Sequence, residues 1–293
     1  MSTDKGYTYL VEQTYDKSTG NKFSILEDIP QEIVDELLSC FKVTGIFHSI
    51  TQIKDIVVQN GSNFQNYVSE RNLSNLRQQN VDRKTIILNA NRLVLNYATS
   101  LKTFIDMETR ILSRHKKTDE LEFFKKLCSH YYDSSKEYRF WMNFRNYIIH
   151  CDFPYHGFNE SLQDGYNLIC SKKHLLEFDN WKHSKRDILE MDDDIDLSGM
   201  VTEMSALIMA LYIDFFAYFG KEITDSILYF SNFCKENNVK HPLFLKTSRK
   251  LTKENYCETV RNSQLNPLPI EALYQVFEQL RSNPNVDITI TSI

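Results

Sequence analysis

The chain has 293 residues, of which 42% are hydrophobic and 13% aromatic, so it can bury a core and is not disordered throughout. Its 8 Gly and 6 Pro are few, which favours long helices over a turn-rich β-sandwich. The formal net charge of -5 excludes a protein that coats nucleic acid through bulk positive charge, so a nucleic-acid substrate needs a local basic site formed by folding or assembly.

The N-terminal residues 1–80 are predicted to form an extension made of a hairpin and helices. Residues 7–15 alternate aromatic and β-branched types, and a turn-forming stretch then sends the chain back, as in a hairpin. Pro30 begins a helix with apolar residues at helical spacing, and Gly45 is expected to separate it from a second helix. The polar residues 59–80 are interpreted as a connection, part of which can be helical.

Residues 81–237 are predicted to form a helical bundle. The clearest amphipathic helix covers residues 86–111, with Asp82 before it as a capping residue. Two further helices are expected over residues 118–131 and 137–151.

The second half of this bundle mixes a hairpin with a long helix. Residues 166–170 and 174–178 are expected to pair, and a helix is expected over residues 198–237. Within that helix, residues 204–219 are the most apolar run, interrupted by Asp214. This run is shorter than the roughly 20 residues of a membrane span, which predicts a buried helix.

The C-terminal residues 238–293 are predicted to form a second extension. They contain several prolines, one helix over residues 270–280 and an alternating stretch, residues 286–293, that suits an edge strand. The expected fold is therefore mainly α, a helical bundle with small peripheral β-hairpins.

The cysteines and the N-terminus bear on localisation. The six cysteines are widely spread and form no C-x-x-C pair, which favours free thiols in a reducing compartment. Residues 1–10 are polar and lack an apolar signal region. We therefore expect a cytoplasmic protein without a membrane partner.

One segment carries a chemically suggestive set of side chains. Arg145, Asn146 and His150 interrupt a helix that otherwise faces a core. The residues between them, 147–149, are apolar, and Pro154 ends the helix just past the His.

The spacing alone is not specific, because Arg110 and His115 have the same spacing at a solvated helix end. The second set differs in its Asn, which lies four residues before His150 and therefore on the same helix face. Arg145 is rotated by about 100° from Asn146 around the helix axis. If two copies of this helix were related by a two-fold axis, Arg145 and the Asn146–His150 face could meet at one phosphodiester.

These residue types suit RNA cleavage without a metal. A His titrates near neutrality, so His150 can move a proton from the 2′-hydroxyl or to the leaving oxygen. The guanidinium of Arg145 can bind the negative charge of the transition state bidentately. Asn146 can orient the His or the phosphate by hydrogen bonding.

The segment resembles the HEPN superfamily (higher eukaryotes and prokaryotes nucleotide-binding). Its signature is an Arg, a polar residue that is often Asn, three more residues and a His near a helix end. Arg145, Asn146 and His150 match these positions. The resemblance covers about residues 81–237, with residues 91–115 as a core helix that packs on the motif helix. It implies a bundle of four or five helices, usually dimerised face to face.

Many members of the superfamily are metal-independent endoribonucleases of phage defence, toxin–antitoxin or RNA-processing systems. The resemblance thus implies a ribonuclease with an RNA substrate, a homodimer, no cofactor, and an antitoxin or regulatory protein as a further candidate partner. One variant family has a Tyr two residues after the His, tied to toxin neutralisation by nucleotidylation. Asp152 stands there in this chain, so that regulation is not expected.

Two alternatives remain open. In the first, Arg145 and His150 only pair with neighbouring side chains of a structural helix. In the second, the chain keeps the HEPN-like bundle as a non-catalytic binding or scaffold protein, which its net acidity and large flanking segments favour.

For residues near the motif, a structural role is expected and a functional role is the alternative. Glu137 and Arg139 are expected on a solvated face, with substrate contact as the alternative. Tyr147 is expected in the core, with a role near the substrate as the alternative. Asp214 is expected to be an exposed or hydrogen-bonded acid, although it would also suit an acid that orients the motif from a neighbouring helix.

Metal binding is not expected. Four acids occupy positions 1, 3, 5 and 12 of a calcium-loop pattern: Asp192, Asp194, Asp196 and Glu203. Leu197 stands where that loop requires Gly, so a cluster of acids at a helix start is the better interpretation. His150, Cys151 and His156 lack a fourth ligand at a recognisable spacing.

Overall fold

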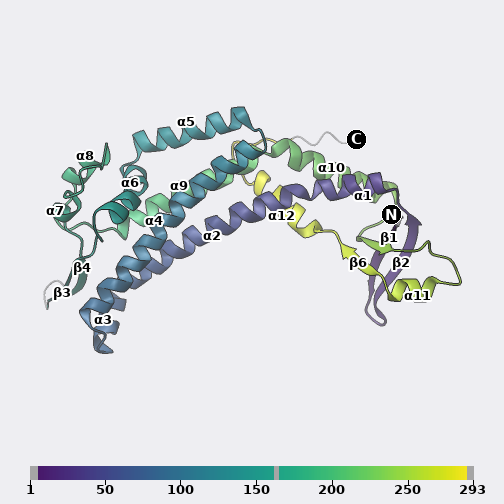
Figure 1. Ribbon diagram of the computed structural model, residues 1–293, viewed down its shortest axis with the longest axis horizontal. Helices are drawn as coiled ribbons and strands as arrows, with labels where there is room; N and C mark the ends of the chain where they lie inside the picture. Colours follow the sequence, from purple (N-terminus) through teal and green to yellow (C-terminus); the bar gives the residue numbers. More distant parts are fainter. Residues whose placement is uncertain (1–5, 162–164, 289–293) are drawn as a thin grey trace, which may run out of the picture. The chain divides into compact units, whose positions relative to one another are not determined.

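The computed structural model describes residues 6–161 and 165–288 (Figure 1). Helices dominate the described chain, and the strands form two antiparallel sheets. The mainly α expectation is confirmed at this level. The chain divides into two compact units, one made of residues up to Phe47 and from Phe219 onward, the other of His48–Tyr218. These boundaries differ from the expected segments 1–80, 81–237 and 238–293 because the two ends of the chain pair with each other.

The first unit contains a four-stranded sheet in the order β2-β1-β5-β6. The predicted N-terminal hairpin is present as β1 (Tyr7–Asp16) and β2 (Gly20–Asp28). Gly20 has a φ of +77°, which the tight turn between them requires. The strands β5 (Pro242–Thr247) and β6 (Gln264–Pro267) were not predicted from the sequence, and β5 pairs with β1.

Four helices complete this unit: α1 (Gln31–Cys40), α10 (Gly220–Glu236), α11 (Tyr256–Arg261) and α12 (Ile270–Arg281). α1 packs on α10, where the rings of Phe41 and Phe230 lie 5.8 Å apart. α10 also packs on α12. The expected C-terminal edge strand is absent from residues 286–288, and residues 289–293 lie outside the described part.

The second unit is built on three long helices: α2 (Lys42–Val68, from His48 onward), α4 (Arg83–Arg114) and α9 (Gly199–Ala217). Gly61 of α2 lies so close to the other two that an added Cβ would be 3.1 Å from Tyr97 and 3.0 Å from Val201. A larger residue would push these helices apart. The side chain of Asp82 caps α4 by accepting a bond from the Thr85 backbone N–H, as expected.

Two sequence-based boundaries were wrong, and the connection over residues 59–80, expected to be helical in part, is helical over most of its length. The break at Gly45 is not seen, because α1 ends at Cys40 and α2 runs through the glycine. Most of residues 59–80 is helical, in α2 and in α3 (Glu70–Gln78), because buried Phe64 and Leu73 anchor otherwise polar sequence in the core. The single helix expected over residues 198–237 is two helices, with the break just before Gly220, a weak helix former.

The remaining elements of the second unit surround the motif helix. α5 (Thr118–Ser134) and α6 (Lys136–His150) lie where helices were predicted. The second hairpin is β3 (Gly157–Ser161) with β4 (Gly165–Ile169). The stretch expected as its return strand instead contains α7 (Lys172–Leu175), which Ser171 caps, and α8 (Ser184–Glu190) follows.

One helix of the described chain, α9, is long and apolar enough to cross a membrane by length and composition. In the second unit it packs on α6, and it buries Val201, Met204 and Ile208. The other face of the helix is partly or fully exposed, so the buried helix predicted from its sequence is buried along one side only.

Candidate functional site

The motif helix α6 has well-defined ends. Its first turn is capped by Ser135, whose hydroxyl accepts a bond from the Tyr138 N–H and donates one to Glu137. At the other end, the Cys151 N–H donates to the Tyr147 carbonyl, and the backbone then leaves helical geometry. His150 is therefore the last residue of the helix.

The inner face of α6 is aromatic and packs on α4, α5, α8 and α9. Its buried residues are Tyr138, Phe140, Trp141, Asn143, Phe144 and Tyr147. Tyr147 stacks on Trp181 at 5.4 Å between ring centroids, and burial raises the pKa of its hydroxyl. The structure thus places Tyr147 in the core, away from the open face of the helix.

The open face of α6 carries the motif. Arg145 and Asn146 are half-buried and His150 is exposed. Their five-residue separation places Arg145 and His150 about 140° apart around the helix axis, at the two edges of this face. Between the edges lie Asn146, the half-buried Met142 and the exposed Ile149.

None of the three motif side chains forms a hydrogen bond or an ion pair with the described residues. A guanidinium and an imidazole that satisfy no group of their own chain can bind an external anion without first breaking an internal contact. The open face therefore offers a cation, an amide and a titratable base to a ligand.

Arg139, on the same helix, is instead fully engaged. It binds both carboxylate oxygens of Asp187 at 2.7 and 2.9 Å and donates to the carbonyls of Tyr132 and Asp133. Both side chains of the ion pair are mostly shielded, with 17% and 12% exposed. One turn later, buried Asn143 donates to the Ser184 hydroxyl at 2.9 Å. These bonds hold α8 against α6.

A cavity of about 650 Å³ opens beside this ion pair. It is lined by residues of both charges: Lys136, Glu137, Arg139, His183, Arg186 and Glu190 among them. Glu137 and Arg139, two residues that the sequence proposed for substrate contact, thus lie together in this cavity. The motif residues Arg145, Asn146 and His150 do not line it.

A histidine pair just beyond the motif helix was not predicted. The rings of His156 and His174 lie 4.8 Å apart, and Asp152 and Glu177 lie 3.4 and 3.6 Å from the two ring nitrogens of His174. No local spacing signals this group because β3, α7 and the turn after α6 bring it together. Among the described residues, no three His, Cys, Asp or Glu side chains are placed to hold a metal ion.

The other acids of interest lie apart from the motif. Asp214 acts electrostatically on Glu108, Tyr131 and Tyr218, towards the beginning of α6 rather than its end. Asp196 accepts bonds from the N–H and hydroxyl of Ser198 just before α9, which agrees with a helix-start role.

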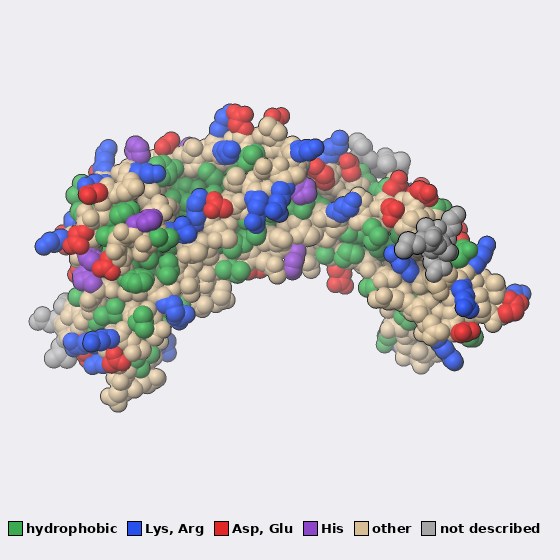
Figure 2. Space-filling view, in the orientation of Figure 1, with side chains coloured by type: hydrophobic (Ala, Val, Ile, Leu, Met, Phe, Trp, Pro, Cys, Tyr) green, Lys and Arg blue, Asp and Glu red, His purple; other side chains and the backbone are tan. Residues whose placement is uncertain are grey.

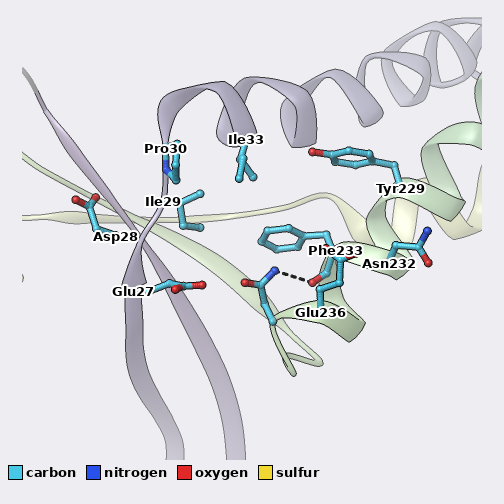
Figure 3. A pocket seen from close by; sticks show the side chains of 10 residues that line it. Glu27, Asp28, Ile29, Pro30, Ile33, Tyr229, Asn232, Phe233 and Glu236 are labelled. Atoms are coloured by element: carbon cyan, nitrogen blue, oxygen red, sulfur yellow. Dashed lines mark hydrogen bonds between the residues drawn. The ribbon is translucent and has the colours of Figure 1, made fainter.

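The first unit has its own cavity, of about 500 Å³, between the end of β2, α1 and α10 (Figure 3). Glu27, Asp28 and Glu236 line it, and the hydroxyl of Tyr229 donates to Glu36 nearby. An acidic lining repels a polyanion, so this cavity does not suit RNA.

On the face shown in Figure 2, basic and acidic side chains are interspersed. An anionic ligand would therefore have to bind to a local group of basic side chains, as the net charge of -5 already indicated. Comparison of the chain with protein-family models, curated proteins and solved structures gave no match.

Proposed function

We propose that the chain is a metal-independent endoribonuclease of the HEPN type. The observation that supports this proposal is the open face of α6, where Arg145, Asn146 and His150 have no polar partner among the described residues. Arg139 on the same helix is by contrast paired with Asp187, so the motif arginine differs from its neighbour in leaving its donors available to a ligand.

The proposed reaction is an internal transfer followed by departure of the downstream strand. The 2′-oxygen attacks the phosphorus, the bond to the 5′-oxygen breaks, and a 2′,3′-cyclic phosphate and a 5′-hydroxyl result. One imidazole accepts the 2′-hydroxyl proton and a second protonates the leaving oxygen. Arg145 binds the charge of the transition state, and Asn146 orients the phosphate or the imidazole.

Two imidazoles at one phosphodiester imply two copies of the chain. Arg145 and His150 lie at opposite edges of the open face, with Met142 and Ile149 between them. Pairing of two such faces would cover the apolar strip and place the Arg of one copy near the His of the other. The proposed enzyme is therefore a homodimer.

Replacement of Arg145 or His150 by Ala tests the proposal. Each variant is expected to lose RNA cleavage by at least about 100-fold, because each removes a charge or a proton carrier used in the transition state. Cleavage is measured on mixed RNA with a chelator present, and the products are analysed for cyclic-phosphate ends. Circular dichroism checks that the fold is retained.

Arg110 and His115 provide a matched control, since they have the same spacing and both are exposed. Their Ala variants should cleave like the parent chain. Undiminished cleavage by the Arg145 or His150 variant would refute the assigned roles. Intact RNA after long exposure to the pure parent protein would favour a binding or scaffold protein, for which exposed Ile149 and Phe153 offer an apolar contact surface.

A further inference from the structure

Glu108, on α4, is a fully buried acid without a partner. It is 0% exposed, and neither carboxyl oxygen forms a hydrogen bond with the described residues. The hydroxyl of Tyr218, at the end of α9, is likewise buried and unbonded. Burial, and then the charge of Asp214, hold the pKa of Glu108 well above its ordinary value of 4.5. The folded bundle therefore favours the neutral carboxyl over the carboxylate.

The groups that interact electrostatically with Glu108 include no cation, and its carboxyl oxygens accept no hydrogen bond from the described residues. These groups are a thiol, two phenols and an acid from three other helices: Cys128 of α5, Tyr138 of α6, and Asp214 and Tyr218 of α9. None is a cation, and burial raises the pKa of Cys128 to about 11. Ionisation of Glu108 therefore requires water to reach it.

Helix α5 covers this acid with a narrow stripe of side chains. Phe124, Cys128 and Tyr131 recur at i, i+4 and i+7 and so lie on one face. The ring of Phe124 lies 6.5 Å from that of Tyr218, and the ring of Tyr131 lies 6.0 Å from that of Tyr138. Phe124 is the sole fully buried residue of α5, which runs along the outside of its unit (Figure 1). Because α5 buries so few side chains, its local opening needs less free energy than that of the core helices.

The connections at both ends of α5 are short, and the one before it provides a hinge. At the α4–α5 turn, Lys116 has a φ of +55°, a left-handed conformation that is uncommon outside glycine. At the other end a single extended residue, Ser135, separates α5 from α6 and caps the latter. α5 can therefore swing about the Lys116 turn once the bonds from Arg139 of α6 to the carbonyls of Tyr132 and Asp133 break.

We propose that α5 is a hinged cover over Glu108 and that its opening releases the carboxyl proton of this residue to solvent. When closed, the cover keeps the neutral acid away from water. When it is open, water solvates the carboxylate and the proton leaves, so each opening event is coupled to one proton. Opening also uncovers the Tyr138 side of the motif helix. This device does not depend on RNA cleavage.

The direction of the pH dependence follows from the raised pKa. Below 4.5 Glu108 is neutral whether α5 is open or closed, so pH has no effect on the cover through this residue. Above 4.5 only the open state ionises. The opening constant should therefore rise about tenfold per pH unit until the pH reaches the pKa of the closed state.

Hydrogen exchange of the full-length protein between pH 5 and pH 8 tests the proposal. Rates are converted to protection factors, so that the intrinsic pH dependence of exchange is removed. The expected result is a loss of protection for the α5 amides that grows as the pH rises above 5, while amides in the centres of α4 and α9 stay protected. Glu108→Gln should abolish this slope.

Two further variants serve as comparisons. Asp106→Asn removes an exposed carboxylate two residues away on α4 and should leave the slope unchanged. Phe124→Ala should raise opening at every pH with the same slope, and it keeps the test decisive if the Glu108 variant fails to fold. A flat wild-type profile, parallel loss of protection in α4 and α9, or a slope that persists in Glu108→Gln would each overturn the proposal.

Discussion

Arg145 and Arg139 lie six residues apart on one helix and differ in what they bind. Arg139 satisfies its donors with Asp187 and two carbonyls, whereas Arg145 has no polar partner in the described chain. Sequence patterning identified Arg145 as chemically suggestive. It did not reveal the pairing of Arg139, because Asp187 follows 48 residues later and α8 must dock before the two meet.

Replacement of Arg139 by Ala should destabilise the protein by about 3 kcal/mol, because it leaves the shielded carboxylate of Asp187 without its partner. Urea unfolding monitored by circular dichroism measures the change. The Arg186–Glu190 pair on α8 is a control, since Arg186 is 86% exposed. Arg186→Ala should change stability by less than about 0.5 kcal/mol. Unchanged stability combined with lost RNA binding in Arg139→Ala would instead support the substrate role.

At the scale of elements, helices with a strong apolar period were predictable. α4 and α6 lie where the period placed them, since each buries a broad stripe in the core. The polar end of α2 and all of α3 were predicted as a connection that is helical only in part, because a few buried side chains such as Phe64 decide their structure. Strand β5 was missed, since its partner β1 lies more than 200 residues earlier and no local signal connects them.

The open face of α6 predicts an association that a single substitution can test. Ile149→Asp would place a charge in the apolar strip between the motif edges, so the proposed dimer should dissociate to a monomer. Light scattering coupled to size exclusion measures the mass. Leu88→Asp on α4, where the leucine is 68% exposed, should leave the mass unchanged. A dimer that survives Ile149→Asp would have to use another surface.

At the scale of the whole molecule, the chain forms two compact units, and the ends of the chain build one of them. Strand β1 pairs along its first half with β5, and Leu10 and Val11 are fully buried there. The stability of the N-terminal hairpin therefore depends on residues near the other end of the chain.

Leu10→Ala should destabilise this first unit by roughly 3 kcal/mol through the cavity that it leaves. Hydrogen exchange should then show loss of protection in β1 and β5 together, while α4 in the second unit remains protected. Leu101 of α4 is also fully buried. Leu101→Ala should therefore reduce protection in the second unit and leave β1 and β5 protected. Loss of protection throughout the molecule in both variants would mean that the two units unfold as one.

The interleaving of the two units has a consequence for biosynthesis. Every residue of His48–Tyr218 leaves the ribosome before β5 does, so the helical unit can acquire its structure while the chain is still being translated. Strand β1 is made before β5 and cannot pair with it until β5 has been translated. Until then, the backbone N–H and C=O groups on that edge of β1 are unpaired. A chaperone that shields such edges would therefore act on β1 until β5 has emerged.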